Sequence, residues 1–477
     1  MYVSTRGKER VSASYAIIKG LASDGGLFVP EEIKKIDFNE DLLKLSYNDL
    51  AFIIFKSFLD DFSDYEIKEV IAKAYNDEFF NGGIVGGEFY DAVSFLDLYH
   101  GPTFAFKDVA LTVLPHLLEK ALKKNNNTKT TVILTATSGD TGSASMSGFS
   151  QTNIKTIVLY PNDGVSRLQE AQMHSFSKDE SIALALNGNF DDCQKIVKEV
   201  FEKVEINGVN LASANSINIG RLIPQIVYYF YHYLECVRRG KIKFKEPINY
   251  VVPTGNFGNI LAGFYAKMMG VPINVLVCAS NKNNVLTDFF NSGQYNKNRE
   301  FYKTMSPSMD ILISSNLERY LYYLLKENSN EVKRLMEELK EYGQYDIKDV
   351  LRKNNKDIIS NYTNEEETLE AIKEVYEKYN LLIDPHTAVS YGAYKKSKIK
   401  GYTAIVSTAS PFKFVNVYKD LFKLSETNEF NQMRELAKKT DTLIDQRILK
   451  LEEVKIDRKV INKEDCINKI KEIVGAL

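Results

Sequence analysis

Short apolar runs alternate with helical patterns through the middle of this 477-residue chain. Each run is nearly continuous in β-branched and other apolar residues, which is typical of strands buried on both faces of a sheet. Between the runs, apolar residues recur every three or four positions, as they do on one face of a helix. This alternation predicts an α/β fold with parallel sheets and crossover helices. The predicted strands are 131–136, 156–160, 182–186, 250–253, 273–278 and 403–407, and the helices between them include 191–204, 219–237, 259–269 and 365–379.

The N-terminal part of the chain has a different pattern. Residues 1–92 predict a mainly helical domain, with helical apolar spacing over 42–60 and 64–80. Ser63 is expected to begin the second helix, because Glu66 three residues later can complete a capping box. Paired glycines after residue 80 then break the pattern and suggest a domain boundary.

Residues 93–427 are predicted to form the α/β domain, with two subdomains and a helical insertion at about 300–360. Most of that insertion, 317–362, is rich in Glu, Lys and Leu. It is expected to be a covering layer with a solvated charged face, and not a site. The C-terminal segment 428–477 has a similar composition and gives no functional signal.

Composition and residue spacing argue against several classes of protein. The net charge of −2 gives no basic surface for nucleic acid. The four cysteines and five histidines are scattered, without the spacing of a metal site or of a disulfide framework. No apolar run approaches the roughly 18 residues of a membrane span, and no signal-peptide pattern follows the first residues. A cytoplasmic protein without a metal or a membrane partner is expected.

Lys107 is the first candidate for chemistry. It lies in the run 101–108 (GPTFAFKD), just before a predicted helix at 108–123. The helix macrodipole disfavours a positive charge there and so lowers the pKa of the amine, which must be neutral to attack an aldehyde and form a Schiff base. Phe104 and Phe106 could exclude water. Taken alone, the same context also fits an ordinary solvated lysine.

A glycine-containing turn far downstream makes Lys107 more informative. It follows strand 250–253, begins helix 259–269, and could bring backbone N–H groups close to a phosphate. An ordinary strand-to-helix turn is the alternative. A Schiff-base lysine and a phosphate site are together what pyridoxal 5′-phosphate (PLP) requires. The residues of this turn are Gly255, Asn256, Phe257, Gly258 and Asn259.

A second polar turn, 137–142 (TSGDTG), follows strand 131–136 and begins another helix. Its hydroxyl and N–H groups could hold the carboxylate of an amino-acid substrate. Asp140 would oppose an anion, so it is expected to face the Schiff base and the phenolic oxygen of the cofactor. The alternative for Asp140 is a helix N-cap.

Three further positions carry candidate side chains. Arg221 could grip a phosphate together with Asn215 and Ser216, although a structural ion pair is its alternative. Thr408, at the end of the last predicted strand, could meet the pyridine nitrogen of PLP or simply cap the next turn. His386 begins a predicted helix, and a helix-start role is favoured over a site role.

Taken in order, these motifs resemble the threonine synthase family in its longer bacterial and fungal form. The resemblance covers nearly the whole chain and is closer than that to threonine dehydratases or cysteine synthases. One position departs from the family pattern, because Ser410 stands where a histidine is usual. The segments that carry the resemblance are 4–7, 20–30, 101–108, 137–142, 188–194, 215–221, 255–259, 306–310, 314–319 and 384–388.

The resemblance implies a fold-type II PLP enzyme, similar to tryptophan synthase β, with two doubly wound α/β subdomains and a mainly helical N-terminal domain. It implies that O-phospho-L-homoserine and water are converted to L-threonine and phosphate, by a monomer or homodimer. Lys107 would carry the Schiff base, the 255–259 turn would hold the PLP phosphate, and Thr408 would meet the pyridine nitrogen. The implied substrate contacts are Ser138, Thr141, Asn215, Ser216 and Arg221.

Two other functions remain open at this point. An eliminating lyase would use the same residues and release 2-oxobutyrate, and no motif reports where water is added. A non-catalytic protein that binds a phosphate ligand would keep the glycine turns, but an intact Lys107 argues against it.

Overall fold

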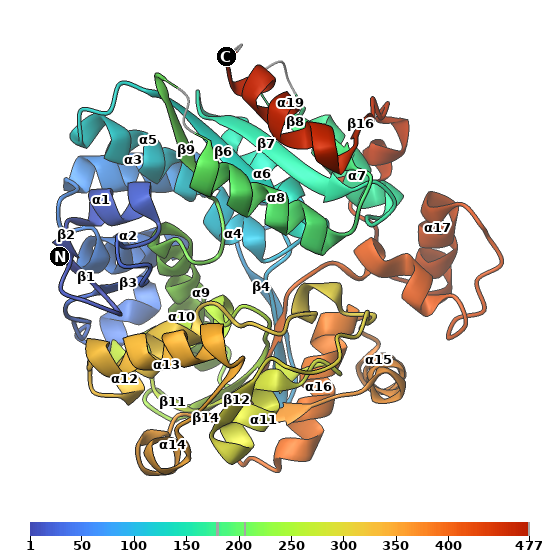
Figure 1. Ribbon diagram of the computed structural model, residues 1–477. Helices are drawn as coiled ribbons and strands as arrows, with labels where there is room; N and C mark the ends of the chain where they lie inside the picture. Colours follow the sequence, from blue (N-terminus) through green and yellow to red (C-terminus); the bar gives the residue numbers. More distant parts are fainter. Residues whose placement is uncertain (178–180, 205–206, 476–477) are drawn as a thin grey trace.

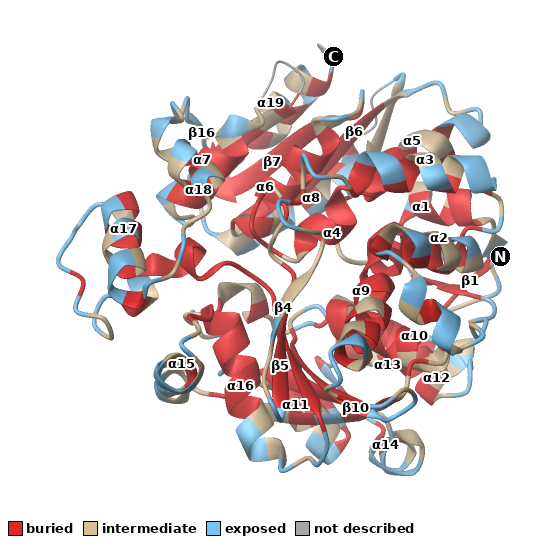
Figure 2. Ribbon diagram, turned by 180° about the vertical axis from the view of Figure 1, so that it is seen from behind, coloured by how far each residue is buried: buried red, intermediate tan, exposed pale blue. Residues whose placement is uncertain are grey.

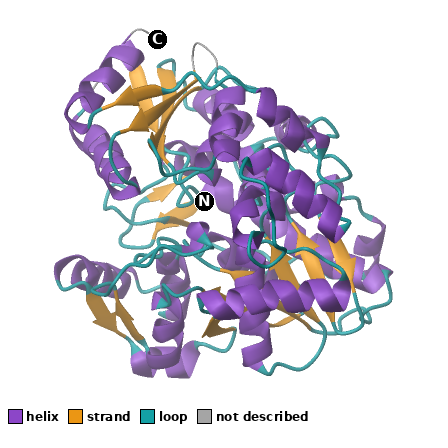
Figure 3. Cartoon of the chain, turned by 90° about the vertical axis from the view of Figure 1, so that its right-hand side faces the viewer, coloured by secondary structure: helices purple, strands orange, loops and turns teal. Residues whose placement is uncertain are grey.

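The computed structural model describes residues 1–177, 181–204 and 207–475. Two parallel sheets, each covered by helices, dominate the molecule (Figure 1), and Figure 3 shows the helices packed around the strands. The predicted α/β fold is therefore confirmed, and all six predicted strands are present. The last two residues of the predicted C-terminal segment, 476 and 477, lie outside the described residues.

The larger sheet has six strands in the order β14-β11-β10-β15-β5-β4. Neighbouring strands are parallel except for β4, which runs antiparallel to β5. The chain places β11 on one side of β10 and β15 on the other, so the strand order switches direction between β10 and β15. Ligands of open α/β sheets bind at such a switch point. The strands are β4 (Gly86–Phe89), β5 (Val93–Asp97), β10 (Ile248–Pro253), β11 (Ile273–Ser280), β14 (Ile358–Tyr362) and β15 (Thr403–Ser407).

The smaller sheet has five parallel strands in the order β16-β8-β7-β6-β9. Its last strand comes from the C-terminal segment, whose helix α19 (Lys463–Gly475) lies beside α8 (Phe190–Lys203) at the top of Figure 1. The α/β part is therefore longer than the predicted range 93–427. Strand β4 lies before that range and joins the larger sheet, and β16 lies after it and joins the smaller sheet. The strands are β6 (Thr130–Ala136), β7 (Lys155–Pro161), β8 (Ser181–Leu186), β9 (Val209–Ala212) and β16 (Lys459–Ile461).

The N-terminal part begins with a small antiparallel sheet, β2-β1-β3, that the sequence pattern did not predict. The predicted helix over 42–60 is two elements, because Ser46 caps α2 after a short 3-10 helix, Glu40–Lys44. Ser63 caps α3 with a capping box to Glu66, as predicted. The remaining bounds are β1 (Tyr2–Ser4), β2 (Arg10–Val11), β3 (Phe28–Pro30), α1 (Ala13–Lys19), α2 (Tyr47–Phe58) and α3 (Asp64–Ala74).

The helix predicted over 108–123 is also broken. It consists of α4 (Lys107–Leu111) and α5 (Leu114–Lys124), because Pro115 has no N–H to donate to the carbonyl of Leu111 four residues earlier. That carbonyl instead faces Gly148, where an added Cβ would lie only 1.9 Å from it. The break therefore lets α6 (Asp140–Phe149) approach α4 closely, which matters for the site.

The predicted helical layer over 317–362 needs one correction. It contains three helices and strand β13 (Gln344–Asp346), but its end is β14, an edge strand of the larger sheet. Ile358 and Ser360 are buried while their neighbours are not, so the apolar signal was too short to stand out among charged residues. The helices are α12 (Leu317–Leu324), α13 (Ser329–Glu341) and α14 (Lys348–Asn354).

Helix α9 (Ile219–Arg238) is buried along most of its length, as its red ribbon in Figure 2 shows. It contacts α2, α4 and α10. None of the helices in the described part of the chain combines the length and apolarity that a membrane crossing requires. The other elements are α7 (Arg167–Ser175), α10 (Gly258–Met268), α11 (Val285–Ser292), β12 (Gln294–Asn296), α15 (Glu365–Tyr379), α16 (Pro385–Ser397), α17 (Glu429–Thr440), α18 (Gln446–Lys450) and 3-10 helices Pro307–Met309, Pro411–Tyr418 and Leu451–Glu453.

Candidate active site

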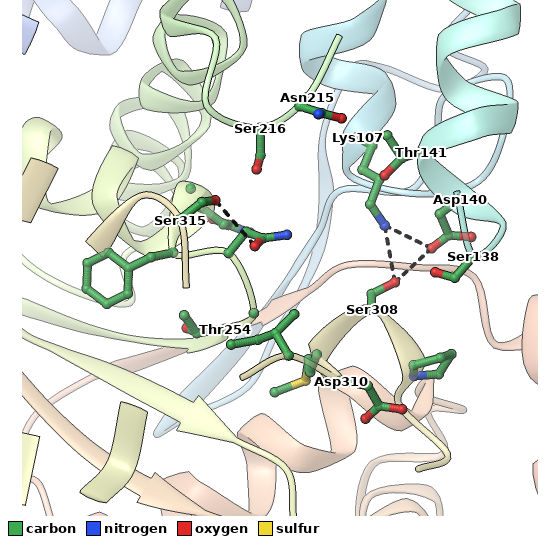
Figure 4. A pocket seen from close by; sticks show the side chains of 18 of the residues that line it. Lys107, Ser138, Asp140, Thr141, Asn215, Ser216, Thr254, Ser308, Asp310 and Ser315 are labelled. Atoms are coloured by element: carbon green, nitrogen blue, oxygen red, sulfur yellow. Dashed lines mark hydrogen bonds and ion pairs between the residues drawn. The ribbon is translucent and has the colours of Figure 1, made fainter. Parts of the chain in front are cut away.

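A cavity of about 640 Å³ lies at the carboxyl ends of β6, β10 and β15, so both sheets contribute to its wall (Figure 4). Every residue that the sequence indicated as a contact of cofactor or substrate lines this cavity, whereas of the two phenylalanines expected to exclude water only Phe106 does. The structure therefore brings together segments more than 300 residues apart. These residues are Lys107, Ser138, Asp140, Thr141, Asn215, Ser216, Arg221, Gly255, Asn256, Phe257, Gly258, Asn259 and Thr408.

Lys107 is the first residue of α4 and its side chain is buried. Its Nζ donates to Asp140 Oδ2 at 3.1 Å and to Ser308 Oγ at 3.2 Å, the three-way contact drawn in Figure 4. Burial lowers the pKa of Lys107 and outweighs the opposing effect of the Asp140 charge. The amine therefore loses its proton more readily than a solvent-exposed lysine.

Asp140 is the centre of the charged groups. Its Oδ1 contacts Lys413 Nζ at 2.8 Å and accepts from Gln169 Nε2 at 3.1 Å, while Oδ2 faces Lys107. Burial works to raise the pKa of Asp140, but the charges of Lys107 and Lys413 hold it well below its usual range. The N-cap alternative for Asp140 is wrong, because Gly139 is the N-cap of α6 and no side chain caps that helix.

Ser308, in the 3-10 helix Pro307–Met309, and His386, at the start of α16, also line the cavity. Ser308 Oγ lies 3.3 Å from Asp140 Oδ2, and its backbone N–H donates to His386 Nε2 at 3.2 Å. The other ring nitrogen of His386 lies 2.7 Å from Asp384, which also caps α16. His386 is thus a helix-start residue, as favoured from the sequence, and in addition lines the cavity.

The turn after β10 opens directly into the cavity. Phe257 adopts the left-handed conformation (φ 62°) as the N-cap of α10, which turns the first N–H groups of the helix toward the cavity wall. An added Cβ at Gly258 would have no neighbour nearer than 3.7 Å, whereas at Gly255 it would lie 2.6 Å from Ser308 O. Asn259 Oδ1 accepts from two tyrosines, but its Nδ2 has no partner among the described residues.

Arg221 is buried in the first turn of α9, where Nη1 donates to Ala214 O at 2.9 Å. In the described part of the chain no carboxylate forms an ion pair with it, and its Nε has no hydrogen-bond partner. Burial alone lowers its pKa to about 10. The structural ion pair considered for Arg221 is therefore wrong for the described residues, and an unpaired buried guanidinium beside Asn215 and Ser216 suits an anion.

Thr408 follows β15 and its carbonyl accepts from Phe106 N at 2.8 Å, which fixes the strand end beside the segment that carries Lys107. Ser410, the departure from the family pattern, does not line the cavity and binds Phe104 O through its N–H at 3.0 Å.

Sequence reasoning missed Lys413, Ser308 and Gln169. Lys413 gave one usable signal, since it is a single charge inside the apolar run 411–415 (PFKFV). Ser308 lies in a motif of the resemblance to which no role was given.

Comparisons with known proteins identify the family. Residues 1–75 match the family model for the threonine synthase N terminus, and residues 87–410 match that for pyridoxal-phosphate-dependent enzymes. The threonine synthase of Schizosaccharomyces pombe is 38% identical, covering 87% of each chain. A PLP-bound threonine synthase structure from Brucella melitensis is 32% identical, with a TM-score of 0.89 over 100% of this chain and 98% of that one.

Threonine synthase-like 1 of Pongo abelii is 38% identical over 90% of this chain, but the chain spans only 61% of that relative's length. The predicted fold-type II architecture and the predicted family are confirmed by these matches. The chain belongs to the threonine synthase family of pyridoxal-phosphate-dependent enzymes.

Proposed function

We propose that this protein converts O-phospho-L-homoserine and water to L-threonine and inorganic phosphate at the cavity around Lys107. The observation that carries the proposal is a buried, pKa-lowered amine that shares one cavity with a helix N-terminus and with a buried arginine that forms no ion pair among the described residues. The family membership supports PLP as the cofactor, and the name of a relative, threonine synthase, supports L-threonine as the product.

The residues present fit PLP. Gly258 leaves free space beside its Cα, and the proposed recess for the phosphate lies there. Its donors are the N-terminal N–H groups of α10 and Asn259 Nδ2, which has no partner in the part of the chain that the structure describes. Lys107 is then the residue to carry the aldehyde carbon, and Thr408 is the hydroxyl offered to the pyridine nitrogen. When bound, PLP supplies an electron sink that makes the substrate Cα–H acidic.

The chain's own residues handle the protons. Lys107, once free, takes the Cα proton of the substrate, gives it up, and then takes a Cβ proton. Each abstraction requires a neutral amine, and burial favours that form. Ser308 Oγ and Asp140 Oδ2 hold the amine from one side, so its lone pair has a defined direction. Phosphate leaves from Cγ, water adds its hydroxyl to Cβ, and the protons taken from Cα, Cβ and water go to Cγ, Cα and the departing phosphate.

The substrate presents two anions besides the cofactor phosphate. Arg221, with Asn215 and Ser216, is proposed to hold the substrate phosphate, since the guanidinium has no carboxylate partner in the described part of the chain. Ser138 and Thr141, at the start of α6, are proposed to hold the carboxylate. We also propose that the protein works in the cytoplasm as a monomer or homodimer.

The test is an assay of the purified protein with PLP and O-phospho-L-homoserine that follows threonine, inorganic phosphate and 2-oxobutyrate together. Equal amounts of threonine and phosphate are expected. Release of 2-oxobutyrate in place of threonine would identify an eliminating lyase instead. Lys107→Ala is expected to lower turnover by at least about a thousandfold, because it removes the proposed acid–base group. Turnover that survives this change would contradict the assignment.

A further inference from the structure

Lys413 is a charged residue that neither the proposed reaction nor the family motifs have used. It lies in the 3-10 helix Pro411–Tyr418, and its side chain is 0% exposed. Its Nζ contacts two oxygens, Asp140 Oδ1 at 2.8 Å and the carbonyl of Thr103 at 2.7 Å. A fully buried ammonium is costly unless it is paired and hydrogen-bonded, so this position is built around the charge.

The two oxygens of Asp140 therefore face two different ammonium groups. Oδ2 faces Lys107 at 3.1 Å, and Oδ1 faces Lys413 at 2.8 Å. Gln169 Nε2 donates to Oδ1 as well and fixes the plane of the carboxylate. One carboxylate cannot neutralise two ammonium groups, so the cluster carries an excess of positive charge.

The other ionisable groups around the cluster leave that excess in place. Arg221 adds positive charge from α9, and His386 faces Asp140 from α16. Asp108 faces Lys413 from α4, and its carboxylate accepts from the N–H and hydroxyl of Thr103. Even with the charge of Asp108 counted, two carboxylates, Asp140 and Asp108, face the three cations Lys107, Lys413 and Arg221.

We propose that Lys413 is a positioning residue for the reaction, a permanent counter-ion that keeps Asp140 ionised and oriented while the charge on Lys107 is lost and regained. The inference rests on the proposed function, in which Lys107 is the amine that forms and breaks a bond to the cofactor aldehyde. Without Lys413, each loss of the Lys107 charge would leave Asp140 buried and without a cationic partner.

A second consequence follows from the same geometry. Because Lys413 shares the counter-ion of Lys107, it weakens the hold of Asp140 on the Lys107 proton and favours the neutral amine. A lysine that only filled space and bonded Thr103 would not have this effect on Lys107.

The experiment measures the reactivity of Lys107 directly. The full-length protein, freed of cofactor, is treated with pyridoxal across a pH series, reduced with borohydride, and the labelled lysines are identified by peptide mass spectrometry. In Lys413→Met, the pH midpoint for labelling Lys107 is expected to move upward, with labelling roughly tenfold slower at pH 7.5. Lys413→Arg restores the charge and is expected to stay within about twofold of the wild type.

An unchanged midpoint in a folded Lys413→Met protein overturns the proposal. If that variant does not fold, Lys413→Gln, which keeps a donor for Thr103 O without the charge, gives the same comparison. Failure of the proposed function looks different, because it appears in the product assay as 2-oxobutyrate in place of threonine, or in wild-type protein whose Lys107 is not labelled preferentially at any pH.

Discussion

Ser308 had no role assigned from the sequence, yet its hydroxyl lies beside Lys107 and Asp140, where the proposed chemistry takes place. It contacts both Lys107 Nζ and Asp140 Oδ2, and His386 accepts its backbone N–H. A hydroxyl can pass a proton or orient a lone pair, whereas a methyl group can do neither.

Ser308→Ala is expected to lower kcat by about ten- to a hundredfold, because Lys107 loses one of the two groups that orient it. PLP retention after dialysis, followed by absorbance, is expected to stay at the wild-type level. Ser150→Ala is the matched control, since Ser150 bonds Ser147 O at the far end of α6 and does not line the cavity. Equal kcat values for the two variants would show that the Ser308 hydroxyl is dispensable.

The two glycines of the 255–259 turn are expected to fail differently when each is changed to alanine. At Gly258 a methyl group meets nothing nearer than 3.7 Å, so Gly258→Ala should fold normally and lose PLP affinity by about tenfold or more, because the methyl group occupies the phosphate recess. At Gly255 the methyl group would lie 2.6 Å from Ser308 O, so Gly255→Ala should also lower the melting temperature.

Isothermal titration with PLP and thermal denaturation separate these effects. Normal PLP affinity in Gly258→Ala would remove the turn from the phosphate site. An unchanged melting temperature in Gly255→Ala would show that the segment around Ser308 moves away from the methyl group without a loss of stability.

At the scale of elements, the segment from residue 304 to 310 is held mainly by the Asp310 carboxylate, and Glu365 adds one bond by accepting from Met305 N at 2.9 Å. Asp310 Oδ1 accepts from Asn281 Nδ2 at 2.8 Å, Asn283 Nδ2 at 2.9 Å and Thr304 Oγ1 at 2.7 Å, and Oδ2 accepts from Thr304 N at 3.0 Å. The segment has little regular structure of its own, so these bonds determine where Ser308 lies.

Asp310→Asn replaces an acceptor with a donor that faces other donors. It is expected to destabilise the protein by about 1–3 kcal/mol and to lower kcat about tenfold through displacement of Ser308. Urea unfolding and steady-state kinetics measure the two effects. Asp288→Asn is the control, because Asp288 forms a half-exposed pair with Arg299 and should change stability by less than about 1 kcal/mol. Equal stability losses in both variants would contradict this role for Asp310.

Elements differ in how far sequence could predict them, and the reasons are physical. The strands on either side of the switch point, 250–253 and 403–407, are buried on both faces and therefore form strong apolar runs. The edge strand β14 buries one face only, so its signal was lost among charged residues. The break before Pro115 has a local cause, the missing proline N–H, which apolar spacing alone does not register, and the approach of Gly148 that it permits comes from a distant helix.

The residues of the site also differ in how well the sequence could predict them, and for the same reason. Lys107 and the turn after β10 were predictable because a helix start and a glycine turn are local features. Lys413 and Ser308 were not, because their importance lies in the 2.8 Å and 3.3 Å contacts to Asp140 that only folding creates.

At the scale of the whole molecule, the buried helix α9 connects different parts of the structure, because it contacts α2, α4 and α10. Its residue His232 is buried and titratable, and it contacts the larger sheet. The ring lies 3.2 Å from Ser94 Oγ on β5 and 3.3 Å from Tyr250 OH on β10, and it stacks on Phe89. Burial, with a smaller contribution from Arg239, lowers the pKa of His232 to about 3. The folded protein therefore keeps this imidazole neutral where an unfolded chain would protonate it.

This difference predicts acid lability with a definite sign. Below pH 6.5 the unfolded state binds a proton that the folded state refuses, so stability falls as the pH drops from 6.5 toward 3. At pH 5 the loss from His232 amounts to about 2 kcal/mol. In His232→Gln, which cannot titrate, the difference in urea-unfolding free energy between pH 7.5 and pH 5 should shrink by about that amount. The half-buried His174→Gln serves as control and should shrink it less, whereas an unchanged difference in His232→Gln would mean that acid loosens the molecule elsewhere.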